Sequence, residues 1–261
     1  MRGIMSFSPQ RLLGVYGDPR VVSLLFFGFS SGLPLALTGA TLAVWLTEAG
    51  VNLTNIGLVS LVGLAYAFKF LWSPLVDRLP IPGLTTLLGR RRSWMLVSQC
   101  AIVAAALAMA VTDPGDPDTR RWTILWALVV AFGSATQDIA IDAYRTEILA
   151  ETQLGAGAAN LVFGYRVGML ASGGGALIIA DAAGWGWAYA LMAALMAVGV
   201  IAVFVNPEPA VRHTPAQQAL EAAGTEWTQR LVGIPSGVRR ALSWGYGAVL
   251  CPFLDFTRRP G

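Results

Sequence analysis

Charged residues are scarce in this sequence: Asp, Glu, Lys and Arg make up 13% of its 261 residues. Soluble domains carry about a quarter of their residues as charges, so this chain has too little polar surface to cover a water-facing globule. Hydrophobic residues make up 55% of the chain, which excludes intrinsic disorder. The composition therefore indicates a membrane protein.

Cysteine and histidine are nearly absent, since the chain has only Cys100, Cys251 and His213. Without a CxxC pair or a second histidine, neither a disulfide framework nor a zinc site is expected. The net charge of +3 is small and the arginines fall in short clusters, so no nucleic-acid partner is expected. Residues 1–20 lack a short apolar core ending at a small-residue cleavage site, and we predict no signal peptide.

Long apolar windows recur along the chain. A membrane helix covers about 30 Å at 1.5 Å per residue, so it needs about 20 residues almost free of charge. The windows found are apolar on all sides, unlike the alternating strands of a membrane barrel. We predict an all-α membrane protein with six transmembrane helices, at residues 21–46, 55–73, 94–111, 122–141, 161–180 and 186–205.

Positive residues are distributed unevenly between the two sides of such a bundle. Short cytoplasmic loops retain lysine and arginine. If the N-terminus, the second and fourth loops and the tail are cytoplasmic, that side holds fourteen arginines. The other side then holds only Arg120 and Arg121. Both termini are therefore predicted to lie in the cytoplasm.

Three regions follow from this pattern: a cytoplasmic N-terminus at 1–20, a six-helix bundle at 21–206 and a cytoplasmic linker at 207–261. The last region is rich in proline, glutamate and glutamine, as linkers are. Its end carries Arg258 and Arg259, a basic flank typical of the approach to another membrane helix. We expect the linker to lead towards a missing second half, which would make this a truncated or half-length chain.

Four ionisable side chains fall within or beside the predicted spans, where each costs about 2.5–3.5 kcal/mol on insertion scales. They are Lys69, Asp138, Asp142 and Arg166. Helix rise places Lys69 and Arg166 about 21 Å, and Asp138 about 24 Å, from the outer surface. Asp138 and Asp142 share one helical face. Two readings stay open: an ion-pair cluster that ties helices together, or a site in which a carboxylate carries a proton and Lys69 or Arg166 meets an anionic substrate.

Small residues are closely spaced in two spans. Residues 28–34 read GFSSGLP, and Gly164 and Gly168 precede SGGG at 172–175. Small residues four positions apart let helices approach closely, and a proline removes one helix hydrogen bond. The pattern predicts close helix packing or a hinge.

The loop between the second and third spans carries DR at 77–78 and GRRR at 89–92. This pair resembles the signature of the major facilitator superfamily, although ten residues separate its two parts. Four further motifs make the resemblance more specific, and over about residues 28–207 the chain resembles the AmpG-type muropeptide permeases of Gram-negative bacteria. These motifs are FSSGLPL, KFLWSPLVDR, SATQDIAIDA and GYRVGML, at residues 29–35, 69–78, 134–143 and 164–170.

This resemblance implies a function. Members of the family import anhydro-muropeptides, the GlcNAc–anhydroMurNAc peptides released from peptidoglycan, across the inner membrane for cell-wall recycling. The proton gradient drives them without a cofactor, and in many species the imported material induces β-lactamase. Their fold has two six-helix halves with the substrate path between them, and this chain resembles the N-terminal half. The expected partners are a sugar-peptide substrate, the lipid bilayer and a second six-helix half.

The resemblance also assigns residues. It implies a substrate and proton pathway and a cytoplasmic gate in which carboxylates and guanidinium groups pair across helix ends. Arg90–Arg92 alone are also explained by the positive-inside rule. The pathway residues are Asp138, Asp142, Lys69, Arg166, Gln137 and Gly32, and the gate residues are Asp77, Arg78, Gly89, Arg90, Arg91 and Arg92.

Other functions were weighed against this one. A related importer or exporter of another solute shares such motifs. A truncated remnant that inserts but transports nothing is favoured by the missing half, whereas the retained charges in the spans argue against it. A membrane-embedded transferase needs a histidine–aspartate pair or a carboxylate cluster near the interface. His213 stands alone in the tail, so the chain is not expected to be an enzyme.

Overall fold

The computed structural model describes residues 14–210. Within that range six helical stretches are long and apolar enough to cross a membrane. The predicted all-α fold with six spans is therefore confirmed. The stretches are Pro19–Glu48, Leu53–Leu71, Arg90–Ala110, Pro117–Ile148, Glu151–Ala183 and Trp185–Val205.

The first span consists of two helices, α2 (Pro19–Thr38) and α3 (Ala40–Glu48), separated at Gly39. The Asp18 carboxylate caps α2 by accepting a hydrogen bond from the backbone N–H of Arg20 at 2.8 Å. The helix continues through Pro34, where the Thr38 hydroxyl donates to the Pro34 carbonyl at 2.8 Å. The interruption therefore comes one turn after the proline.

The second span was predicted as one helix over residues 55–73, and the structure has one continuous helical stretch at Leu53–Leu71. Within it α-helical and 3₁₀ segments alternate: α4 (Leu53–Val59), η1 (Ser60–Gly63), α5 (Leu64–Phe68) and η2 (Lys69–Leu71). The pieces η1 and η2 are 3₁₀ turns, which often mark hinges when they interrupt a helix. The span is also the least buried of the six.

Two short helices, α6 (Ser73–Arg78) and α7 (Leu84–Leu88), connect this span to α8 (Arg90–Ala110). The next helix, α9 (Pro117–Ile148), begins with a proline behind its capping residue Asp116. Its predicted end at residue 141 was wrong, because the helix continues for two further turns into polar sequence. This extension carries the charged side chains of Arg145 and Glu147 to the end of the bundle.

The fifth span contains η3 (Glu151–Gln153), α10 (Leu154–Leu170), η4 (Ala171–Gly175) and α11 (Ala176–Ala183). The glycine run, for which close packing or a hinge was predicted, forms η4, a single π-helical turn. Its Ser172 carbonyl accepts a hydrogen bond from the hydroxyl of Thr41 in α3 at 2.7 Å. The sixth span is formed by α12 (Trp185–Leu195) and α13 (Ala197–Val205).

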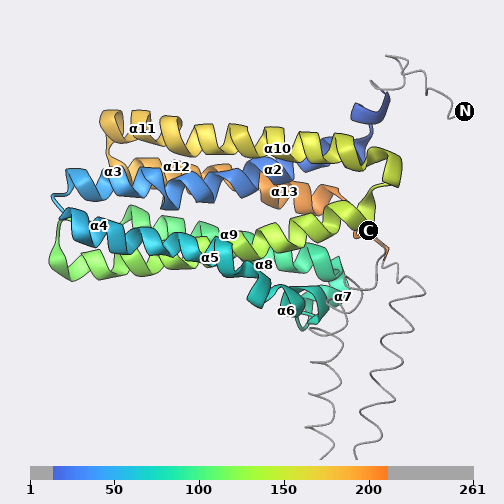
Figure 1. Cartoon of the computed structure of the whole chain (residues 1–261), viewed down its shortest axis with the longest axis horizontal. Coiled ribbons are helices and arrows are strands. Elements are labelled where there is room, and N and C mark those ends of the chain that lie inside the picture. The colour runs from blue at the N-terminus through green and yellow to red at the C-terminus, as the bar shows by residue number, and fades with distance from the viewer. Residues whose placement is uncertain (1–13, 211–261) are drawn as a thin grey trace, which may run out of the picture.

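The long helices lie roughly side by side in layers (Figure 1). The first and fifth spans, α2–α3 and α10–α11, run together with α12 and α13 beside them. The helices α4, α5, α8 and α9 form the other layer, with α6 and α7 at one end. Two clusters of buried apolar side chains fill the interior, one at each end of the bundle.

The close packing predicted from the small residues occurs between α2 and α10, which are parallel. A Cβ on Gly28 would lie 2.1 Å from the Leu161 carbonyl oxygen, and one on Gly164 would lie 2.0 Å from the Leu25 carbonyl oxygen. The two backbones therefore touch, with no space for a side chain between them.

Candidate functional site

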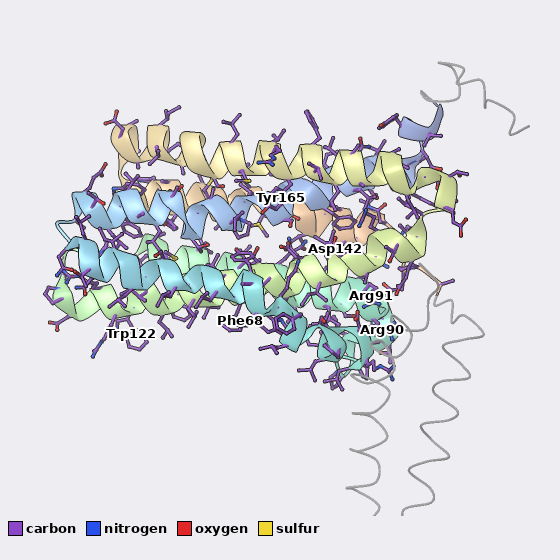
Figure 2. All side chains as sticks on the ribbon, viewed as in Figure 1. Phe68, Arg90, Arg91, Trp122, Asp142 and Tyr165 are labelled. Carbon is purple, nitrogen blue, oxygen red and sulfur yellow. The ribbon has the colours of Figure 1, made fainter. Side chains whose placement is uncertain are left out.

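A polar stripe runs along α9, and we define it by Ser134, Asp138, Asp142 and Arg145. These residues are three or four positions apart and therefore share one face of the helix. Asp142 lies on the side of α9 that faces the layer of α2 (Figure 2). Charged side chains within an apolar span cost free energy of membrane insertion unless they are paired. Whether that cost is offset therefore depends on the partners of the stripe on the neighbouring helices.

Asp138 is held by α2, because the Ser31 hydroxyl donates a hydrogen bond to its Oδ1 atom. The preceding residues on both helices are also paired: Gln137 Nε2 lies 3.4 Å from Ser30 Oγ. Gln137 and Ser30 are fully buried. Two adjacent side-chain pairs thus fix α9 against α2 at the level of Asp138.

Asp142 pairs with cations from two directions. The Lys69 Nζ atom lies 3.7 Å from its Oδ2 atom, and the Arg145 Nη2 atom lies 3.9 Å from its Oδ1 atom. The Lys69 side chain is 35% exposed and that of Asp142 is 53% exposed. Ion pairs this open contribute at most about 1 kcal/mol, so a ligand carboxylate can compete with Asp142 for Lys69.

Arg166 was predicted to lie at the same depth as Lys69 and Asp138, and in the structure it pairs with neither Asp138 nor Asp142. It is exposed on α10 and forms no ion pair within residues 14–210. Gly32 serves the crossing of the two helices, since a Cβ there would lie 2.1 Å from the Tyr165 carbonyl oxygen. Of the six predicted pathway residues, the structure joins Lys69 with Asp142.

The predicted gate residues gather at the end of the bundle next to α6 and α7 (Figure 2). Arg91 is their centre: its Nη1 atom lies 2.6 Å from Asp77 Oδ1 and its Nη2 atom 2.6 Å from Glu147 Oε1. The Arg91 Nε atom also donates to the Glu147 carboxylate. The Arg91 side chain is 7% exposed, whereas those of Asp77 and Glu147 are 45% and 23% exposed, so in this bridge between α6, α8 and α9 the cation is buried and its carboxylate partners are partly open to solvent.

A second carboxylate, Glu208, caps the start of α8. Its Oε1 and Oε2 atoms accept the backbone N–H groups of Arg91 and Arg92 at 2.7 and 3.0 Å. Gly89 leaves room for it, because a Cβ there would lie 2.2 Å from the Glu208 Cγ atom. Arg92 Nε donates to the Val203 carbonyl at the end of α13, at 2.7 Å. The segment after α13 is thereby fastened to the start of α8.

Two predicted gate residues remain, Arg78 and Arg90. Arg78 is the last residue of α6. Arg90 lies near the Glu147 and Asp77 carboxylates, but its buried Nε atom has no hydrogen-bond partner in the described part of the chain. The sequence analysis missed Glu147 because the predicted span ended too early, and it missed Glu208 because that residue was assigned to the linker. The available signal was an acidic residue a short distance beyond each predicted span, six positions beyond for Glu147 and three for Glu208.

The described residues contain no group of three His, Cys, Asp or Glu side chains that could hold a metal ion. The site offers carboxylates, a lysine and hydroxyl groups. Such groups can bind protons and polar or anionic ligands.

Comparison with known proteins shows the family to which this chain is similar. The sequence model of the Major Facilitator Superfamily matches residues 24–256. The anhydromuropeptide permease of Escherichia coli K12 is 48% identical over 215 residues, which cover 82% of this chain and 42% of the relative. A putative transporter AmpG 4 of Rickettsia felis is 34% identical over 250 residues, covering 94% of this chain and 54% of the relative. The chain thus spans about half the length of the curated relatives it matches.

Proposed function

The chain belongs to the major facilitator superfamily, and we propose that its six-helix bundle imports anhydro-muropeptides in symport with protons, together with a second six-helix bundle. The proposal is supported by 48% identity to a permease named for this substrate. One structural observation carries the mechanism: the ion pair between Lys69 and Asp142, one turn from Asp138, on the polar stripe of α9.

Proton binding and substrate binding can be coupled through this pair. Protonation of Asp142 removes its negative charge and releases Lys69 to bind a carboxylate of the peptide part of the substrate. When the proton leaves, Asp142 recovers Lys69 and the substrate carboxylate is displaced. Asp138, held by Ser31, is the second carboxylate that can carry the proton. The exposure of Lys69 and Asp142 allows this exchange of partners.

The cluster around Arg91 serves as the cytoplasmic gate in this proposal. It holds the ends of α6, α8 and α9 and the Glu208 segment as one unit. The bundle can then move as a rigid body against a second one, as alternating access requires. The proton gradient supplies the energy, without a cofactor or a chemical reaction. The chain lies in the inner membrane with both termini in the cytoplasm, and the import supports peptidoglycan recycling and the induction of β-lactamase.

Uptake of labelled GlcNAc–anhydroMurNAc peptide tests this proposal. The 261-residue chain is expressed in cells that lack their own muropeptide permease, alone and with the C-terminal half of the E. coli permease. We expect uptake in the paired cells that stops when an uncoupler collapses the proton gradient. Inserted protein that gives no uptake in either arm, while the complete E. coli permease restores it, would overturn the proposal.

A further inference from the structure

A groove of about 380 Å³ lies on the surface of the bundle between α8 and α9. Its lining includes Ser98, which is buried, and Gly133, where a Cβ would lie 3.0 Å from the Ile102 Cγ1 atom. It also includes the exposed side chains of Leu128 and Phe132. The groove therefore has small residues where the two helices meet and large apolar ones at the surface.

Several lining side chains are held in place by their neighbours. The Trp94 indole N–H donates to the Leu79 carbonyl at 2.9 Å. The Phe132 ring packs against the Trp72 ring with centroids 5.0 Å apart, and the Trp72 indole N–H donates to the Thr136 hydroxyl at 3.2 Å. That hydroxyl donates in turn to the Phe132 carbonyl at 2.7 Å. The groove is thus preformed, and its lining is almost entirely apolar.

The length of the groove fits one leaflet of a membrane. Its lining runs along α8 from Trp94 to Ala101, a rise of about 10 Å. The hydrocarbon core is about 30 Å thick, so the groove covers less than half of it. Because α8 begins at Arg90, one turn before Trp94, the groove starts near the membrane surface. A membrane helix of another protein would need a face across the whole bilayer, whereas an acyl chain needs only one leaflet.

Arg90 stands at the surface end of the groove, at the end of the bundle next to α7 (Figure 2). It is four positions before Trp94 and therefore shares that face of α8. Arg90 is partly exposed and forms no ion pair within residues 14–210. The Asp77 and Glu147 carboxylates near it are bound by Arg91 instead. An uncompensated guanidinium group at a membrane surface attracts anions, and its planar donors match a phosphate.

We propose that this groove binds an anionic phospholipid of the surrounding bilayer, with an acyl chain between α8 and α9 and the phosphate at Arg90. Inside the bilayer the acyl chain is already out of water, so it gains van der Waals contacts with the preformed groove. The charge of the headgroup then selects among lipids that have the same chains. This lipid site does not depend on which solute the chain transports. Because α8 also carries Arg91, the bound lipid holds the helix at the centre of the gate.

Native mass spectrometry of the purified 261-residue chain in detergent tests the site. It measures the Kd of dioleoylphosphatidylglycerol and of dioleoylphosphatidylcholine, which have the same acyl chains but differ in net charge. The variants are Ala101→Phe, which fills the groove, and Arg90→Gln, which removes the cation. Their controls are Ala159→Phe, at an exposed alanine on α10, and Arg20→Gln, at an exposed arginine at the start of α2. Circular dichroism checks folding, and Ala101→Leu replaces Ala101→Phe if the larger ring prevents it.

We expect the unsubstituted chain to bind phosphatidylglycerol more tightly than phosphatidylcholine. Arg90→Gln should raise the Kd of phosphatidylglycerol about fivefold, the effect of one arginine at a membrane surface, and leave that of phosphatidylcholine unchanged. Ala101→Phe should raise both values, because its ring occupies the space of the acyl chain. The proposal is overturned if the unsubstituted chain binds the two lipids equally tightly, or if either variant binds phosphatidylglycerol as tightly as its control.

Discussion

The contact between α2 and α10 gives a prediction whose size follows from the structure. A methyl group added at Gly164 would lie 2.0 Å from the Leu25 carbonyl oxygen and 3.0 Å from the Phe29 nitrogen. Carbon and oxygen atoms normally approach to about 3.3–3.6 Å, so the helices would have to separate by roughly 1.3 Å. The obstructing atoms belong to the backbone and cannot rotate away.

We expect Gly164→Ala to destabilise the bundle. Overpacking of this kind costs about 1–3 kcal/mol. The better helix propensity of alanine returns about 1 kcal/mol, so a net loss of roughly 0–2 kcal/mol remains. Gly155 is the matched control, because it lies on the same helix and a Cβ there would have no atom within 4 Å. Gly155→Ala should leave stability unchanged or raise it.

Thermal unfolding of the purified chain in detergent, followed by loss of the monodisperse peak, compares the two variants. A second substitution at Gly28, which faces Leu161 in the same contact, should add less than its own single effect, because the helices have already separated. If Gly164→Ala unfolds at the same temperature as the Gly155→Ala control, the two backbones do not touch as described.

Three further predictions concern the charges. Arg91→Ala should lower the free energy of unfolding by about 1–3 kcal/mol, because it removes charge-assisted hydrogen bonds to Asp77 and Glu147, whose carboxylates water can partly solvate once the cation is gone. Thermal unfolding measures the change, and an unfolding temperature equal to that of the unsubstituted chain would contradict the role of Arg91. Glu208→Ala should lower the free energy of unfolding by about 1 kcal/mol, because it removes the cap of α8. It should also make the segment after α13 more accessible to protease, and an unchanged cleavage rate would contradict the cap. Lys69→Gln should change stability by less than about 1 kcal/mol yet abolish uptake in the paired cells, so uptake at the unsubstituted level would refute its role.

Hydropathy was sufficient to place all six spans, because each needs a long apolar stretch and the chain has six of them. It could not locate the interruptions. Pro34 indicated a bend or hinge in the first span, yet α2 passes through it and stops five residues later at Gly39. The second span is largely apolar, and its sequence did not show that 3₁₀ turns would alternate with α-helix along it. Such breaks depend on packing against neighbouring helices, which composition along one helix does not record.

The candidate site could be predicted only in part. The spacing of Asp138 and Asp142 placed them on one face, and Lys69 does reach Asp142. Arg166 was placed by depth alone, and depth does not say which way a side chain points around its helix. The contact between Glu208 and the start of α8 joins residues more than 100 positions apart. It arises from the packing of the helix ends, which no local pattern reveals.

Transport by reconstituted protein tests the central claim most directly. The chain and the C-terminal half of the E. coli permease are placed in proteoliposomes, and labelled muropeptide is followed with and without an imposed inward proton gradient. The account predicts that the gradient drives accumulation, that Asp142→Asn abolishes it, and that Asp181→Asn, a change at an exposed aspartate on α11, does not. Accumulation that is equal with and without the gradient, or that persists in Asp142→Asn, would contradict it.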